Sequence, residues 1–334
     1  MKTLIPKFRH AVALYTSFSA NVFRLVWIRL TKERGTPLLG IFLLEHLGDI
    51  VACEPVSRQV RQVHPNAIII WCVKKGYREL LDGNPYITRV CTLHCLTERS
   101  YIANSGLFDD VIDLHFPERY CSLCNRNVPV KAMKRSEIAL NNFYRFGNIA
   151  QSFARYAGLS LIDDTPHVYI SDYAEQKILS LKLPATYITV HCATNAEAKD
   201  WRREKWEAFS QRFFAEYNIS IIEVGTEATM NRSSSSMYLN MCGRLSILET
   251  ASVIRMSALF IGVDSGPAHL ANAVGTYGVL LMGPFLGFKR YNPFGGSYRN
   301  QSYCEIIYNH TAVAEISVEE VFAAAARRIR TLMS

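Results

Sequence analysis

Four loops of this sequence combine residue types that could bind an anionic group or accept a proton. The most distinctive lies within residues 260–275, which read FIGVDSGPAHLANAVG. An apolar strand is expected to end at Asp264, Ser265 and Gly266 form a turn, and the proline that follows is suited to open a helix. Backbone N–H groups at a helix start attract phosphate, and Ser265 and His269 would add hydrogen-bond donors. The structural alternative is a plain strand–turn–helix in which Asp264 or Ser265 caps the helix.

A second loop, His46-Leu47-Gly48-Asp49, lies between the first predicted strand and the helix that follows it. In open α/β sheets, ligands bind at the carboxyl ends of parallel strands, so Asp49 would lie where a substrate binds. Held beside a hydroxyl group, this carboxylate could take the proton as the oxygen attacks, which is general base catalysis. Aspartate is also a common helix cap, and that is the structural alternative.

Two further loops supply polar side chains after strands of the second half of the chain. Thr194, Asn195 and Lys199 follow the predicted strand 187–191. A lysine there would place a mobile positive charge against a diphosphate. Glu227 follows the next predicted strand, where acids of dinucleotide-binding folds accept hydrogen bonds from ribose hydroxyls. A solvated loop is the alternative interpretation of both segments.

The elements that position these loops alternate between short apolar strands and helices. Runs without polar alternation, such as 38–44 and 67–73, are typical of parallel strands covered on both faces. The pattern restarts at residue 187, which predicts two α/β halves with helices on both faces of each sheet. The predicted strands are 38–44, 67–73, 87–93, 187–191, 219–224, 259–263 and 278–282, and the predicted helices are 48–63, 76–82, 131–157, 203–217, 246–257, 267–274 and 317–332.

The chain is expected to divide into two Rossmann-like domains with an additional segment at each end. With 334 residues it is too long for one core. A less regular stretch with Asp and Pro residues, around 163–184, is where the domain boundary is expected. We predict a basic amphipathic extension over residues 1–36, a first domain over 37–180, a second domain over 181–315 and a C-terminal helix over 316–334.

The N-terminal extension carries most of the net positive charge. Residues 1–37 hold seven Lys and Arg residues and one acid, so they account for six of the eight net charges. Residues 10–23 are too short and too polar to span a bilayer, and no cleavable secretory signal is apparent. A helix lying on an anionic membrane surface and a helix packed on the rest of the protein both fit the pattern. The apolar stripe expected on this helix comprises Phe8, Val12, Tyr15, Phe18 or Ser19, Val22, Leu25 and Val26.

Composition restricts the functional classes. The chain is 49% hydrophobic and 20% charged, which excludes a disordered, collagen-like or coiled-coil protein. A net charge of +8 suits a partner that carries phosphates. Nucleic-acid binding is not expected, because the basic residues are not interleaved with aromatic residues in a recognised module.

Cysteine usage favours a reducing compartment and does not predict a metal site. The nine cysteines are scattered through a large chain rather than spaced as a disulfide scaffold. Only one Cys-x-x-Cys pair, Cys121 and Cys124, is present, with His115, Cys91 and Cys95 upstream. Because two such pairs are typical of zinc sites, we expect reduced, unliganded thiols.

The loops form a larger pattern that extends over about residues 38–330. Its specific part is D-S-G-P-A-H at 264–269 at the appropriate distance from Gly48-Asp49-Ile50. The supporting matches are Pro55, His64-Pro65, Asn84-Pro85, Lys199-x-Trp201, Trp206, Gly225-x-Glu227, Gly243 and Gly283-Pro284. Together, in this order, these segments resemble glycosyltransferase family nine, the bacterial heptosyltransferases of lipopolysaccharide core assembly. Residues 45–47 depart from the family pattern, since they read Glu-His-Leu rather than small hydroxyl residues.

The resemblance implies a fold, an activity and a set of roles. The fold would be GT-B, with two Rossmann-like domains whose parallel sheets face each other across a cleft, and with no obligatory metal or other cofactor. The activity would be transfer of a sugar, usually a heptose from ADP-heptose, with inversion at the anomeric carbon. Asp49 would be the general base, Glu227 would bind the ribose and Asp264 would lie near the sugar or phosphate. The remaining donor-binding residues would be Thr194, Asn195, Lys199, Ser265, Gly266 and His269.

The expected acceptor is a phosphorylated or lipid-linked glycan such as the lipopolysaccharide core, because the basic N-terminal region suits an anionic partner. We therefore expect a cytoplasmic protein, with attachment to the inner face of the cytoplasmic membrane as an accompanying hypothesis. Two alternatives stay open, since fold does not fix chemistry. One is a non-catalytic nucleotide-sugar-binding or assembly protein, and the other is a sugar-nucleotide epimerase of the same architecture.

Overall fold

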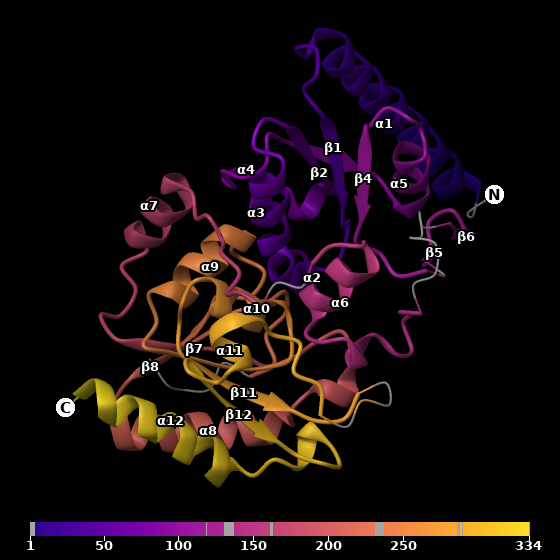
Figure 1. The fold of residues 1–334 in the computed structure, drawn as a ribbon. Helices are drawn as coiled ribbons and strands as arrows, with labels where there is room; N and C mark the ends of the chain where they lie inside the picture. Colours follow the sequence, from indigo (N-terminus) through magenta and orange to yellow (C-terminus); the bar gives the residue numbers. More distant parts are fainter. Residues whose placement is uncertain are drawn as a thin grey trace. The chain divides into compact units, whose positions relative to one another are not determined.

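Two parallel β-sheets, one in each half of the chain, organise the computed structural model (Figure 1). The chain divides into residues 1–162, called unit 1, and residues 163–334, called unit 2. Helices connect successive strands of each sheet, so the predicted α/β class with Rossmann-like parallel sheets is confirmed. The structure describes residues 4–117, 119–129, 137–160, 163–230, 237–285, 288 and 290–333.

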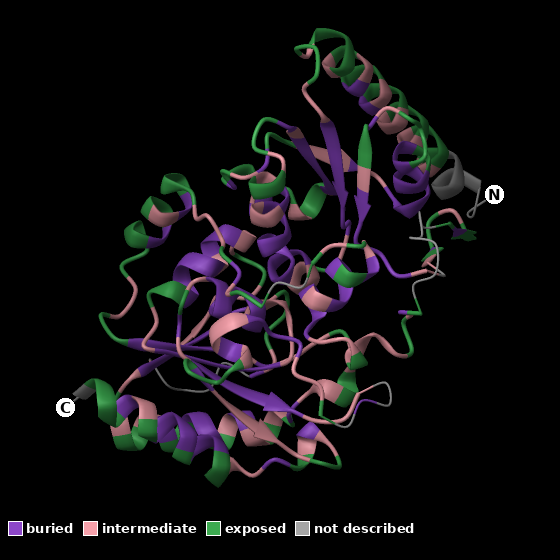
Figure 2. Cartoon of the chain, in the orientation of Figure 1, coloured by how far each residue is buried: buried purple, intermediate pink, exposed green. Residues whose placement is uncertain are grey.

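Unit 1 is built on a four-stranded parallel sheet in the order β3-β2-β1-β4. The central strand β1 pairs with both neighbours, so that Ile41 lies opposite Trp71 on one side and Ile112 on the other. All residues of β1 are buried, as the apolar run predicted (Figure 2). The strands are β1 (Leu38–Phe42), β2 (Ile68–Lys74), β3 (Arg89–Leu93) and β4 (Asp110–Asp113).

The helix expected over 48–63 is interrupted. It forms two helices, α2 (Leu47–Ala52) and α3 (Glu54–Val63), with Cys53 between them. A proline in the first turn of α3 explains the restart, because proline lacks the N–H that would continue α2 but fits the start of a helix.

The prediction of a helix over residues 131–157 is wrong for about half of the described part of that range. Residues 137–148 form turns and a short 3₁₀ helix, and only α6 (Ile149–Tyr156) is α-helical. Residues 130–136 lie outside the described part of the chain. Asn148 begins α6 with a reciprocal capping box to Gln151, a local start signal that overrides the weak upstream pattern. The other elements of unit 1 are α4 (Glu79–Asp82), α5 (Leu96–Ala103) and the antiparallel hairpin β5 (Arg119–Cys121) and β6 (Arg126–Val128).

The N-terminal extension forms α1 (Leu4–Thr31), which packs on unit 1 (Figure 1). Leu25 is buried in the core of unit 1, and the side chains that pack against the same core are Leu14, Phe18, Val22 and Ile28. The predicted apolar stripe is therefore only partly correct, because Val12 and Tyr15 are exposed. Apolar side chains occur on both faces of this helix.

A buried carboxylate also fastens α1 to the unit. Glu98 of α5 is fully buried and accepts hydrogen bonds from the Ser17 hydroxyl at 2.9 Å and the Asn21 amide at 2.9 Å. The backbone N–H of His94 donates to the same carboxylate at 2.6 Å. This face of α1 is a packing surface. By length and composition alone, residues 9–31 would suffice to cross a membrane, which differs from the sequence expectation.

Unit 2 contains a six-stranded parallel sheet in the order β12-β11-β10-β7-β8-β9. Helices α8 and α12 pack on each other and on one face, while α9 and α10 lie on the other face (Figure 1). The strands are β7 (Tyr187–His191), β8 (Ser220–Glu223), β9 (Tyr238–Asn240), β10 (Leu259–Val263), β11 (Gly278–Met282) and β12 (Cys304–Tyr308). The helices are α7 (Asp172–Ser180), α8 (Arg203–Tyr217), α9 (Ile247–Arg255), α10 (Gly266–Ala273), α11 (Gly296–Arg299) and α12 (Val318–Met333).

The boundary between the units falls at residues 162 and 163, earlier than the 180 and 181 expected from the sequence. The reason is α7, which packs on α9 of unit 2 through two ion pairs. Lys177 bonds Glu249 at 2.7 Å, and Arg255 lies 2.6 Å from Glu175. The C-terminal helix is likewise part of unit 2, because α12 contributes buried residues to its core.

Candidate functional site

Three of the predicted site loops follow adjacent strands of the unit 2 sheet. Strand β7 pairs in parallel with β10 on one side and with β8 on the other. Because parallel strands end at the same edge of a sheet, the loops after β7, β8 and β10 leave that edge side by side. These loops carry residues 194–199, 225–227 and 264–269, so every predicted donor-binding residue lies at this edge.

Lys199 and Asp264 meet at this edge. The Lys199 ammonium lies 2.6 Å from a carboxylate oxygen of Asp264, and both side chains are about three-quarters buried. The same ammonium lies 4.4 Å from the centre of the Phe285 ring, a cation–π contact. Trp201 fixes the lysine's loop, since its indole N–H donates to the backbone carbonyl of Ile316 at 2.9 Å. In the Lys-x-Trp motif, Lys199 thus supplies the cation and Trp201 holds its loop in place.

The start of α10 carries two buried polar atoms without a protein partner. Ser265 is the N-cap residue, yet its side chain makes no capping hydrogen bond. Its hydroxyl oxygen and Nδ1 of His269 are both buried and unpaired among the described residues. Buried polar groups are normally hydrogen-bonded, so this pair marks a place where a ligand would complete the bonding. The backbone N–H groups of the first turn point the same way as the positive end of the helix dipole.

His269 is held as a neutral imidazole. The residue is only 5% exposed and its ring lies 4.5 Å from that of Phe294. Burial lowers the pKa of His269 to about 4; the nearby charge of Asp264 raises it and that of Lys199 lowers it. A neutral ring has one N–H donor and one acceptor nitrogen, so His269 is suited to hydrogen bonding rather than to charge pairing.

Thr194 and Asn195 have different surroundings in the loop after β7. The Thr194 hydroxyl donates to the Ala196 carbonyl at 2.9 Å and accepts from the Ala196 N–H at 3.0 Å. The backbone N–H of Thr194 donates to Asp200 at 2.7 Å. The hydrogen bonds of Thr194 therefore fix the conformation of this loop, whereas the side chain of Asn195 is exposed.

Glu227 is exposed at the end of β8, on a loop that a second acid organises. Glu223 is buried and accepts hydrogen bonds from the backbone N–H groups of Thr229 at 2.6 Å and Met230 at 3.3 Å. Gly225 begins the loop with φ of +147°, and a Cβ there would lie 3.0 Å from the His191 ring. Sequence reasoning missed Glu223, because a strand-end acid gives no sign of whether it points inward.

Asp49 lies in unit 1, at the third residue of α2 and beyond the carboxyl end of β1. One of its carboxylate oxygens accepts a hydrogen bond from the backbone N–H of His46 at 3.3 Å. The side chain is partly exposed. It therefore takes part in a capping box, close to the structural role considered from the sequence, while remaining accessible to solvent.

Three charged side chains of unit 1, Glu45, Lys74 and Arg119, lie near Asp49. Glu45 pairs with Lys74. Burial would raise the pKa of Glu45, but the hydrogen bond and charge of Lys74 outweigh it and hold that pKa below its usual range. Arg119 of β5 is close enough to interact with Asp49 and Glu45; burial lowers its pKa, and these two acids oppose that shift.

Three fully buried side chains, Arg99, Asp113 and His115, form a triad that supports the loop before Asp49. Asp113 at the end of β4 pairs with Arg99 and lies 2.8 Å from Nδ1 of His115. The backbone N–H of Leu44 donates to Nε2 of His115 at 3.2 Å, so Nδ1 carries the proton and donates to Asp113. Burial lowers the pKa of His115 despite the opposing effect of Asp113, which agrees with this neutral form. The triad fixes the chain just before Glu45, and sequence reasoning had not assigned it.

Comparison with known proteins relates part of this chain to a family. Residues 151–297, which include most of the unit 2 site, match the family model described as glycosyltransferase family 9 (heptosyltransferase). This part of the chain is therefore similar to family 9 glycosyltransferases. The resemblance predicted from the sequence motifs is confirmed, and the family 9 match covers all the predicted donor-binding residues. A search of curated proteins finds no match.

Solved structures share the fold of this chain at low sequence identity. The glycosyltransferase family 9 protein of Veillonella parvula aligns with a TM-score of 0.68 and 18% identity, over 88% of this chain and 97% of the other. The Escherichia coli ADP-heptose lipopolysaccharide heptosyltransferase II aligns with a TM-score of 0.65 and 15% identity, over 90% of this chain and 100% of the other. The iron-containing heptosyltransferase TibC, solved with ADP-D-β-D-heptose, aligns with a TM-score of 0.61 and 14% identity, over 90% of this chain and 78% of the other. The predicted GT-B fold class is thereby confirmed.

Proposed function

We propose that this protein is an inverting glycosyltransferase that moves a heptose from ADP-heptose to a lipopolysaccharide core or related phosphorylated glycan. The observation that carries the proposal is the cluster at the carboxyl edge of the unit 2 sheet. There Lys199 pairs with Asp264 beside a helix start with two unpartnered buried polar atoms. The structure of TibC with ADP-D-β-D-heptose supports this choice of donor.

Donor binding would complete the bonding of this cluster. A nucleoside diphosphate placed at the start of α10 would accept hydrogen bonds from backbone N–H groups and from the Ser265 hydroxyl. Gly266 leaves room for close approach of the phosphate, His269 supplies a neutral donor and Lys199 supplies the cation. Glu227 and Asn195, both exposed, would contact the ribose and the sugar, and Thr194 would hold the lysine's loop in place.

Leaving-group stabilisation would come from the same groups. When the bond between the sugar and the diphosphate breaks, negative charge grows on the phosphate oxygen. Fixed N–H donors and the Lys199 ammonium can stabilise that charge in a partly buried site. We propose that the transfer step therefore needs no metal ion.

The acceptor would be activated by Asp49 of unit 1. Its carboxylate would take the proton from the attacking hydroxyl group as the new glycosidic bond forms. Attack on the face opposite the leaving diphosphate inverts the anomeric carbon. The basic groups near this loop, Lys74 and Arg119, suit a phosphorylated acceptor.

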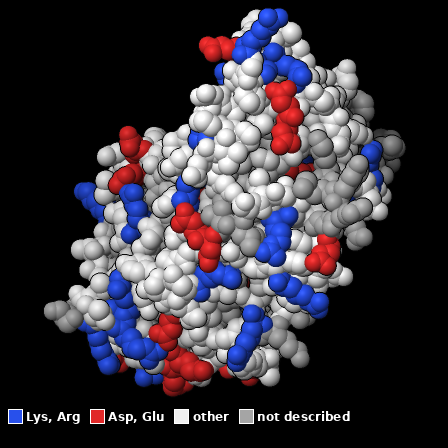
Figure 3. All heavy atoms as spheres, in the orientation of Figure 1, with Lys and Arg blue, Asp and Glu red and all other residues white. Residues whose placement is uncertain are grey.

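The exposed face of α1 would bring the enzyme to the cytoplasmic face of the membrane. Phe23, Trp27 and Leu30 are 71%, 61% and 76% exposed. Basic side chains gather at the C-terminal end of α1 (Figure 3), where Arg29 and Lys32 pair with Asp109. Exposed aromatic and aliphatic side chains on a helix that ends in basic residues suit interfacial membrane binding.

Turnover with defined substrates tests the proposal. The full-length protein is incubated with ADP-heptose and a lipopolysaccharide core acceptor that lacks the transferred heptose, and ADP release and product mass are measured. ADP formed only when the acceptor is present, with a product heavier by one heptose, is the expected result. Donor binding without transfer would instead indicate a non-catalytic binding protein, and altered free sugar nucleotide without acceptor would indicate an epimerase.

A further inference from the structure

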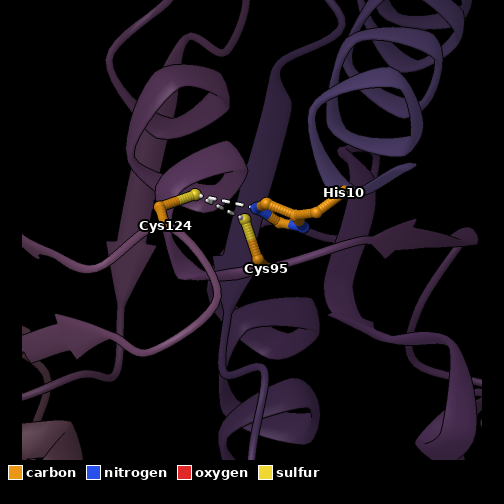
Figure 4. A group of neighbouring side chains, drawn as sticks. All are labelled: His10, Cys95 and Cys124. Carbon is orange, nitrogen blue, oxygen red and sulfur yellow. Dashed lines mark hydrogen bonds between the residues drawn. The ribbon is translucent and has the colours of Figure 1, made fainter. Parts of the chain in front are cut away.

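A second group of reactive side chains lies in unit 1, outside the residues assigned to sugar transfer. His10 of α1, Cys95 at the start of α5 and Cys124 in the β5–β6 hairpin converge from three elements (Figure 4). Nε2 of His10 lies 3.1 Å from Sγ of Cys124, and the two sulfur atoms lie 3.8 Å apart. All three potential ligand atoms are within 4.8 Å of one another.

These spacings agree with a tetrahedral metal centre. Zinc–sulfur bonds are about 2.3 Å long, so two thiolates on one tetrahedral zinc lie about 3.8 Å apart. That is the separation of Cys95 and Cys124. The corresponding nitrogen–sulfur separation is about 3.6 Å. His10 Nε2 lies 3.1 Å from the Cys124 sulfur, and all three ligand atoms lie within 4.8 Å of one another, so a small side-chain adjustment would bring them to these separations.

The other nitrogen of His10 has the partner that a metal-binding histidine needs. Nδ1 of His10 lies 2.8 Å from Nε2 of His94, and the two rings stack with centres 4.9 Å apart. A ligating histidine usually donates its second N–H to a neighbouring acceptor, which fixes the ring and the tautomer. With Nδ1 donating to His94, Nε2 is left as an acceptor facing the two thiols.

We propose that His10, Cys95 and Cys124 bind one structural Zn²⁺ ion in unit 1. Two thiolates and an imidazole are a soft donor set that suits zinc rather than magnesium or calcium. Cys121 would be the fourth ligand, because it is buried three residues before Cys124 in the same hairpin, the Cys-x-x-Cys spacing of zinc knuckles. Its sulfur lies outside the group of three ligand atoms, so its side chain would have to move when the ion binds. A closed set of four protein ligands would make the site structural.

The ion would join three parts of unit 1 that are far apart in sequence. It would clamp α1 to α5 and to the β5–β6 hairpin, adding to the contacts of Glu98. The hairpin begins with Arg119, which interacts with Asp49 and Glu45. Zinc binding would therefore stabilise the N-terminal helix and hold the strand that carries Arg119.

Metal analysis of the full-length protein tests the site. Protein purified under reducing conditions without chelator is analysed by mass spectrometry for zinc, and about one ion per chain is expected. Cys124→Ser and His10→Gln should each lower the zinc content several-fold. Cys91→Ser is the matched control, because Cys91 is a partly buried cysteine of the same unit outside the cluster, and it should retain the ion.

Cobalt substitution supplies a readout that does not depend on a variant that folds poorly. Wild-type protein stripped of metal and titrated with Co²⁺ should develop the thiolate charge-transfer and tetrahedral d–d absorption bands. His94→Ala should keep these bands and weaken binding about 10- to 100-fold. Zinc-free wild-type protein that shows no cobalt bands, zinc content unchanged by Cys124→Ser, or a disulfide between Cys95 and Cys124 would each overturn the proposal.

Discussion

The ammonium of Lys199 lies 2.6 Å from the carboxylate of Asp264, although 65 residues separate them in the sequence. The pair joins the loops that follow two adjacent strands, β7 and β10, at one edge of the unit 2 sheet. Asp264 thereby holds the lysine beside the start of α10 before any ligand binds. Preorganised charge of this kind lowers the cost of binding an anion, because less side-chain freedom is lost on association.

Removing this cation should weaken donor binding. Lys199→Ala is expected to raise the Kd for ADP about 10- to 100-fold, since hydrogen bonds to charged groups contribute about 1.5–3 kcal/mol. Isothermal titration calorimetry measures the change. Lys177→Ala is the control, because Lys177 pairs with Glu249 on α7 and α9 and should leave the Kd unchanged. Equal affinity in wild type and Lys199→Ala would contradict a phosphate-binding role.

The buried His269 should make unit 2 sensitive to acid. Its pKa is about 4 in the folded state and 6.5 when unfolded, so the unfolded state binds more protons between these values. Stability is therefore expected to fall as pH drops below 6.5, by about 2 kcal/mol at pH 5 from this group alone. Urea unfolding at pH 7.5 and pH 5 measures the difference, and His269→Gln should reduce it. An unaltered pH dependence in His269→Gln would show that the ring is not buried as a neutral group.

The buried triad behind the Asp49 loop should be essential for stability. Asp113→Asn leaves Arg99 charged and without its carboxylate partner in the core, which is expected to cost about 3–5 kcal/mol. Thermal or urea unfolding measures this loss. Asp110→Asn, at an exposed position of the same strand, should change stability by less than about 0.5 kcal/mol. Comparable stability of the two variants would argue against the triad as a support.

Membrane attachment through α1 can be tested without removing the helix. Deletion would uncover the core that Leu25 fills, whereas Phe23 and Trp27 are mostly exposed. Replacing these two with Ser should reduce binding to anionic vesicles at least about tenfold, because burying each aromatic side chain contributes about 1.5–3 kcal/mol. Tyr173→Ser, at a 75% exposed position of unit 2, is the control for general surface effects. Vesicle binding that is absent in wild type, or that survives the double substitution, contradicts the attachment.

Short-range sequence pattern was enough to predict much of the fold and the position of the unit 2 loops in it. Apolar runs located the central strands, and the D-S-G-P-A-H motif placed Asp264 and Ser265 at the start of α10. Lys199 was found because a lysine followed a strand. The Trp201 contact with Ile316 explains why the tryptophan accompanies that lysine.

Features that depend on long-range contacts were not predictable from one sequence. Asp113 and His115 lie at a strand end, but their pairing with Arg99 of α5 requires the folded chain. The cluster of His10, Cys95 and Cys124 was missed for a similar reason, because a search for a second Cys-x-x-Cys pair overlooks single side chains that come from other elements. The starts of α3 and α6 were also missed, because a proline and the Asn148 capping box determine them and hydrophobic periodicity carries no information on either.

The role of Asp49 is the central claim, and the turnover of Asp49→Asn tests it most directly. Transfer from ADP-heptose to a lipopolysaccharide core acceptor should fall by about 10²- to 10⁴-fold, the usual contribution of a general base. The Kd for ADP should be unchanged, and Asp82→Asn, at an exposed position of unit 1, should transfer at the wild-type rate. Circular dichroism confirms that both variants are folded. Wild-type turnover in Asp49→Asn would contradict the assignment of the base.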